Sequence, residues 1–158
     1  MSIWFLFNLL LLLLSIWKLL IRHPFSISYW PLLLGFISLL FFLFNWTRHA
    51  VFSTIRNTPV RQKKIKWANL SKKVMPIHRW TGTIALFFVI IHGVSIISRY
   101  GIPIQWSKFT VGLCAGILMI SMVITGWLRL YWPTRTKRML HLYIGMTLFI
   151  IIFLHILL

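Results

Sequence analysis

Two apolar segments of this 158-residue chain carry histidines at the same spacing. HRWTGTIALFFVIIH runs from His78 to His92 and HLYIGMTLFIIIFLH runs from His141 to His155, so both fit H-x3-G-x9-H. Fourteen residues turn an α-helix by about 1400°, roughly 40° short of four full turns, and span about 21 Å. Each segment, if helical, therefore presents two imidazoles on one face, one toward either surface of a hydrocarbon core about 30 Å thick.

The chemistry of these histidines depends on how the two segments pair. If both run in the same direction, His78 and His141 share one level, and His92 and His155 share the other. Two facing imidazoles at one depth suit the axial positions of an iron porphyrin. A zinc or copper site gathers its ligands around one ion, and about 21 Å between levels excludes a single four-histidine site. We therefore predict two stacked b-type haems, with these four histidines as iron ligands.

Glycines and arginines near the histidines are further candidates for haem binding. Gly82 and Gly145 each follow the first histidine of their segment by four residues and so share its face. The missing side chain would let a flat macrocycle approach the backbone. Haem propionates need basic partners, and Arg99 and Arg138 lie one to two helical turns from a ligand histidine. The alternative role of these arginines is membrane topology or snorkelling to the surface.

Long apolar blocks must position these groups. Hydrophobic residues make up 59% of the chain, and about 20 mainly apolar residues suffice for a membrane-spanning helix. Five blocks qualify, at about 3–21, 29–47, 77–98, 110–132 and 139–158. We predict an all-α, polytopic membrane bundle of about five helices that forms a single domain over 1–158, with a basic cytoplasmic loop at about 48–76.

The charge pattern restricts both function and topology. The chain has no Asp or Glu and 17 Lys plus Arg. This excludes carboxylate general bases, paired-carboxylate hydrolases and acidic calcium or magnesium sites. Because the cations cluster between apolar blocks, we expect membrane topology and lipid contact rather than nucleic acid. Thirteen cations fall on one side and four on the other, which predicts the N-terminus inside and the C-terminus outside. We expect an integral, multi-pass protein of the plasma (inner) membrane.

The remaining motifs favour packing over chemistry. His23 and His49 lack partners at the 14-residue spacing and are expected at the membrane interfaces. Gly112 and Gly116 form a small-xxx-small pair, which is typical of helix packing. The single cysteine, Cys114, has no partner for an intrachain disulfide.

The H-R-W-x-G…H segment from His78 to His92, together with the second 14-residue histidine spacing, resembles the ferric reductase-like transmembrane domain. That family includes the membrane parts of NADPH oxidases and ferric reductases, and the haem-binding subunit of bacterial periplasmic methionine sulfoxide reductase systems. The resemblance covers about 30–158. It implies that the four histidines match the family's axial ligands and that electrons pass from a cytoplasmic donor to an acceptor outside. Larger members have a sixth helix and a nucleotide-binding region, whereas this chain shows neither a sixth apolar block nor a GxGxxG loop.

We therefore expect a di-haem transmembrane electron conduit, an oxidoreductase component that needs a separate donor. A cytoplasmic flavoprotein could dock on the basic segment from Arg56 to Lys73 by electrostatic steering. Two alternatives stay open. One is a quinol-linked cytochrome b subunit of a larger complex, and the other is a haem-free membrane scaffold subunit. The extracytoplasmic acceptor is not indicated by any motif.

Overall fold

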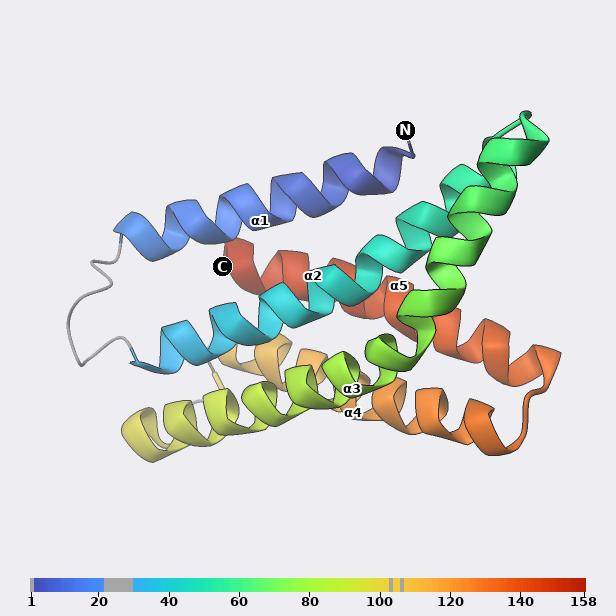
Figure 1. Ribbon diagram of the computed structural model, residues 1–158. Coiled ribbons are helices and arrows are strands. Elements are labelled where there is room, and N and C mark those ends of the chain that lie inside the picture. The colour runs from blue at the N-terminus through green and yellow to red at the C-terminus, as the bar shows by residue number, and fades with distance from the viewer. Residues whose placement is uncertain (1, 22–29, 103, 106) are drawn as a thin grey trace.

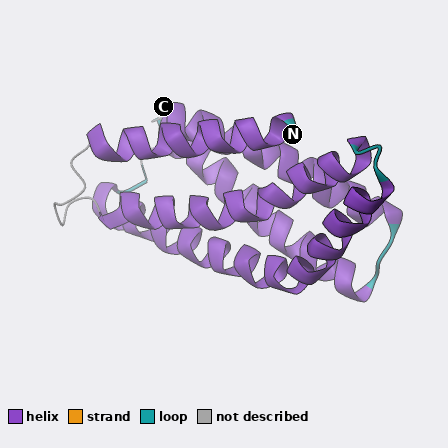
Figure 2. Ribbon diagram, turned by 45° about the horizontal axis from the view of Figure 1, so that its top comes forward, coloured by secondary structure: helices purple, strands orange, loops and turns teal. Residues whose placement is uncertain are grey.

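The chain folds into five α-helices and their short connections. The computed structural model describes residues 2–21, 30–102, 104–105 and 107–158. The helices are α1 (Ile3–Ile21), α2 (Trp30–Asn57), α3 (Arg61–Tyr100), α4 (Ser107–Tyr131) and α5 (Arg135–Leu157), as Figure 1 shows. Within these residues every regular element is helical (Figure 2). The predicted all-α fold with five helices is confirmed.

All five helices are long and apolar enough to cross a membrane. The outside of the bundle is covered with large apolar side chains, which a water-soluble protein avoids in large patches. On α1, for example, Leu6 is 62% exposed and Trp17 is 63% exposed, and on α5 Ile150 is 58% exposed. Apolar side chains exposed in this way suit contact with lipid, and a helix also bonds its own backbone polar groups, as a membrane span must.

The helices form a closed ring. Each packs on the next along the chain, and α5 packs against α1. The Nζ of Lys18 on α1 donates a hydrogen bond of 2.9 Å to the carbonyl of Leu157 on α5, which links the first helix to the last. Helices α3 and α5 both contact α4, but among the described residues no Cα of α3 lies within 8 Å of a Cα of α5. Side chains alone therefore span the space between α3 and α5.

Aromatic side chains fill the centre of the ring. Trp46 on α2 is only 4% exposed. Its ring stacks on Phe149 of α5 at a centroid distance of 5.1 Å and on Phe42 at 6.1 Å. Leu11 of α1 and Leu148 of α5, both fully buried, complete the layer. Since Phe149 lies between His141 and His155 on α5, this core layer separates the two histidine levels.

The predicted basic loop at 48–76 is wrong, because most of it is helical. Helix α2 continues to Asn57 and α3 begins at Arg61, which leaves only residues 58–60 outside the helices. Pro59 explains the break, since proline disfavours helical backbone in the residue before it. Beyond the break the segment is rich in Arg, Lys, Gln, Ala and Leu, all good helix formers. A helix has no physical reason to end where its apolar stretch ends.

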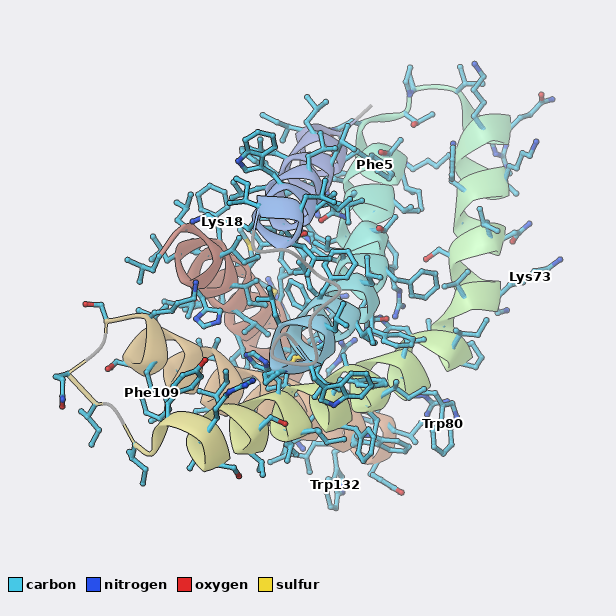
Figure 3. All side chains as sticks on the ribbon, turned by 90° about the vertical axis from the view of Figure 1, so that its left-hand side faces the viewer. Phe5, Lys18, Lys73, Trp80, Phe109 and Trp132 are labelled. Atoms are coloured by element: carbon cyan, nitrogen blue, oxygen red, sulfur yellow. The ribbon has the colours of Figure 1, made fainter. Side chains whose placement is uncertain are left out.

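The first part of α3, residues 61–76, forms a projecting basic arm. Helix α3 has 40 residues, about 60 Å at 1.5 Å per residue, which is twice the thickness of a bilayer core. Pro76 lies within it and removes one backbone donor from the helix. Figure 1 shows the arm turning away from the rest of α3. In Figure 3 the bundle is seen nearly end-on, while the arm that carries Lys73 is seen from its side.

The arm marks one end of the bundle. The N-terminus and the α4–α5 junction lie at this same end (Figure 1), which we call the basic end. The α3–α4 junction lies at the other end, the far end. All described side chains from Arg61 to Leu70 are exposed. The arm carries six cations, at Arg61, Lys63, Lys64, Lys66, Lys72 and Lys73.

Candidate functional site: two histidine pairs

The fold brings the four histidines together as two pairs. At the basic end, the rings of His78 (α3) and His141 (α5) have centroids 6.5 Å apart, with an angle of 79° between their planes. At the far end, the rings of His92 and His155 are 6.4 Å apart, with an angle of 81°. All four side chains are half-buried. The two pairs join the same two helices and have nearly the same geometry.

The separation of the rings matches two imidazoles bound to one metal ion from opposite sides. Metal–nitrogen bonds to histidine are about 2.0–2.1 Å long. A five-membered ring with bonds of about 1.33 Å has its atoms about 1.1 Å from the centroid. Opposed axial imidazoles therefore place their centroids about 6.3 Å apart. The observed 6.5 and 6.4 Å agree with this value.

His92 is held by α2. Its Nδ1 lies 2.7 Å from the carbonyl oxygen of Pro31. A carbonyl can only accept, so Nδ1 carries the proton and Nε2 keeps its lone pair for a metal. The ring also rests on Gly35, where an added Cβ would lie 3.1 Å from Cε1 of His92.

His155 is held by α4 in the same way. Its Nδ1 donates to the carbonyl of Lys108 at 3.1 Å. A Cβ on Gly112 would lie 2.8 Å from Cε1 of His155, a distance that real Cβ atoms essentially never show. Gly112 was predicted to serve helix packing, and the group that packs against it is the imidazole of His155.

His141 is held by α4 through one intervening hydroxyl. Its Nδ1 lies 3.0 Å from Oγ1 of Thr125, and that hydroxyl donates to the carbonyl of Met122 at 3.0 Å. Since the hydroxyl proton is used there, Oγ1 accepts from Nδ1–H of the imidazole. A Cβ on Gly126 would lie 3.3 Å from Cε1 of His141.

These three arrangements share one pattern, which we call a histidine seat. A glycine supports the imidazole, and the carbonyl four residues before that glycine receives the Nδ1 proton, either directly or through Thr125. Outer hydrogen bonds of this kind fix the tautomer and orientation of a metal-binding histidine. The three seats are Pro31 with Gly35, Lys108 with Gly112, and Met122 with Gly126.

His78 has no such seat. Its Nδ1 is buried and has no hydrogen-bond partner among the residues that the structure describes. On α2, the position that would repeat the fourteen-residue spacing after Gly35 is occupied by His49, so α2 has no second glycine there. The ring of His49 contacts the rings of both Trp4 and Trp46, at centroid distances of 4.9 and 5.0 Å. This histidine, expected at an interface, thus belongs to an aromatic cluster, and His23 lies outside the described residues.

The two predicted glycines lie against side chains of neighbouring helices. A Cβ on Gly145, which is buried, would meet Met122 and Trp46 at 3.1 Å each. A Cβ on Gly82 would lie 3.5 Å from Nδ2 of Asn45. Both positions therefore allow close approach from α2 or α4.

The predicted arginines lie at the ends of their helices. Arg99 lines an open surface cavity of about 420 Å³ at the far end, together with Trp30, Pro31, Ser95 and Ser98. That cavity adjoins the seat of His92, because both include Pro31. Arg138 lies in the exposed first turn of α5.

Two arginines that were not among the predicted haem partners lie within electrostatic reach of the basic-end pair. The charges of Arg48 on α2 and Arg129 on α4 act on both His78 and His141. The Nε of Arg48 is buried and has no hydrogen-bond partner among the described residues. Because the chain contains no Asp or Glu, no side-chain carboxylate of its own can neutralise this pair. These positions suit an anionic ligand.

The seat glycines were also missed, although the sequence holds a signal for them. Gly112 and Gly126 are fourteen residues apart, which repeats the histidine spacing. Their alignment with His155 and His141 requires the antiparallel register of α4 and α5, which only the fold provides. Within the described residues, His, Cys, Asp and Glu form no group of three or more that could hold a metal ion, so metal binding here would rest on the pairs. No protein-family model, curated protein or solved structure matches this chain.

Proposed function

We propose that this protein is an integral membrane cytochrome that holds two b-type haems, one between His78 and His141 and one between His92 and His155. The observation that carries the proposal is the matched pair geometry. Both pairs have the ring separation that opposed axial ligation requires, and three of the four histidines have Nδ1–H engaged so that Nε2 is available. Bound haem supplies a one-electron Fe(III)/Fe(II) couple at each level.

The chain's residues supply ligation, orientation and insulation for this couple. The seats fix three imidazoles, and the aromatic layer around Trp46 and Phe149 fills the space between the two levels with low-dielectric material. Arg48 and Arg129 are placed to neutralise the propionates at the basic end, and Arg99 is a candidate at the far end. With two axial histidines at each iron, electrons would pass at the haem edges without a substrate bound to metal.

The proposed direction of transfer follows from topology. The basic end faces the cytoplasm, because cations concentrate on the cytoplasmic side of membrane proteins. A separate donor, of the flavoprotein kind, reduces the basic-end haem after docking on the arm, and an extracytoplasmic acceptor takes the electron at the far end. This is the role that the ferric reductase-like resemblance implies.

The test is a haem count on protein purified after expression with ample haem. Pyridine haemochrome analysis and spectra of the oxidised and dithionite-reduced protein should give two low-spin b-type haems per chain. His92→Ala and His141→Ala should each lose or alter one haem, while His49→Ala, which changes a histidine outside the pairs, should keep both. A folded, haem-supplied protein without a Soret band would overturn the proposal and favour the scaffold function.

A further inference from the structure

The four candidate ligands are not equivalent. Three histidines rest on a glycine and donate their Nδ1 proton to a neighbouring helix. His78 has neither support, and its buried Nδ1 finds no partner among the described residues. Loss of such an outer hydrogen bond typically costs a metal-binding histidine about 10–100-fold in metal affinity.

His78 also differs from the other three ligands in having a proline close before it in its helix. Pro76 lies two residues before it, inside α3. A proline within a helix removes one i→i−4 hydrogen bond and crowds the carbonyl four residues earlier. No proline lies within the six residues before any of the other three ligands. His78 therefore sits where α3 bends into the exposed arm, at the edge of the bundle.

From this difference, and on the basis of the proposed function, we infer that the basic-end haem is a binding site for neutral diatomic ligands. Of the four histidines, His78 is the one that an incoming ligand would displace from iron. With haem bound, exchange would break the bond between Fe(II) and Nε2 of His78 and form one bond from Fe(II) to the incoming ligand, with no change of oxidation state. His141, held by Thr125, stays bound on the opposite side. The far-end haem, with both histidines seated, stays closed.

Carbon monoxide is the probe, because it binds ferrous haem without redox chemistry. The dithionite-reduced, two-haem protein should take up about one CO per chain, with an affinity at least about tenfold higher than any second binding step, in line with the cost of a missing outer hydrogen bond. The variant His92→Ala/His155→Ala, which keeps only the basic-end haem, should retain this uptake. Uptake by neither haem, equally by both, or only at the far end would overturn the inference.

The identity of the departing ligand is tested with Thr125→Val in an otherwise intact chain. Resonance Raman spectra of the photolysed CO complex report the stretch between iron and the remaining histidine. Because Thr125 bonds to His141 and, among the described residues, to no other histidine, the variant should shift this frequency if His141 remains bound. An unchanged frequency would mean that His78 stays and His141 leaves, which would overturn the inference. Protein without haem would instead count against the proposed function, so the two failures are distinguishable.

Discussion

A methyl group on Gly112 of α4 would lie 2.8 Å from Cε1 of His155, so the missing side chain leaves room for this imidazole beside α4. The same glycine leaves the carbonyl of Lys108 open to the Nδ1 proton of that ring. The position of a proposed iron ligand thus depends on a residue of another helix, 43 positions earlier in the chain.

Gly112→Ala should damage the far-end site selectively. The added methyl displaces the ring of His155, so the far-end haem should be lost or change its electron paramagnetic resonance signal, while the basic-end haem is retained. Gly93→Ala is the matched control, because a Cβ at Gly93 meets nothing within 4 Å. Equal haem content and spectra in the two variants would contradict the assigned role of Gly112.

Thr125→Val should raise the reduction potential of the basic-end haem. Valine keeps the shape of threonine but removes the oxygen that accepts from Nδ1 of His141. A less basic imidazole stabilises ferric iron less well, and second-shell losses of this kind typically weaken metal binding by about 10–100-fold. Redox titration followed at the α band measures the shift. Ser121→Ala is the control, since Ser121 bonds within its own helix to Ile117, and an equal shift there would reject the prediction.

The two ends of the bundle should differ in accessibility from the cytoplasm. Gln62 in the arm and Gln105 at the far end are both exposed. In a Cys114→Ala background, Gln62→Cys should react with a membrane-impermeant maleimide only after the cells are opened, and Gln105→Cys should react in intact cells. The reverse pattern would mean that the N-terminus and the arm lie outside.

Neutralising the arm should slow reduction by an acidic flavoprotein donor. Lys63→Gln, Lys64→Gln and Lys66→Gln together remove three exposed cations, so the rate constant for reduction should fall about tenfold or more at low salt and approach the wild-type value at high salt. Stopped-flow reduction measures this effect. Arg135→Gln with Lys137→Gln changes two cations at the same end but outside the arm, and a similar loss there would indicate a charge effect without a docking surface.

Much of the helical framework is predictable from composition and periodicity. Continuous apolar stretches determine which residues enter helices, and the bounds of α1 agree with the sequence prediction. The pairing of His78 with His141 is also predictable, because equal spacing on two parallel helices leaves one register. The first conclusion depends on local pattern, and the second also depends on the alternating direction of successive membrane spans.

The arm and the seats were not predictable in the same way. Hydropathy detects apolar residues and therefore misses a helix that continues into a cationic segment, as α3 does before His78. The contacts of Gly35, Gly126 and Arg48 depend on which faces of α2 and α4 turn inward, and packing between helices decides that. The resemblance to a haem-binding family also concerns the ligands and does not extend to their supports.

Both histidine pairs join α3 to α5, and the whole of α4 separates the two helices along the chain. During synthesis, α3 therefore enters the membrane with His78 and His92 unpaired, and their partners follow 63 residues later in each case. Closure of the ring and completion of both sites thus coincide with the arrival of a single helix. Under the proposed function, cofactor capture would therefore be a checkpoint on assembly, because a chain without α5 holds neither complete site and a chain with α5 holds both.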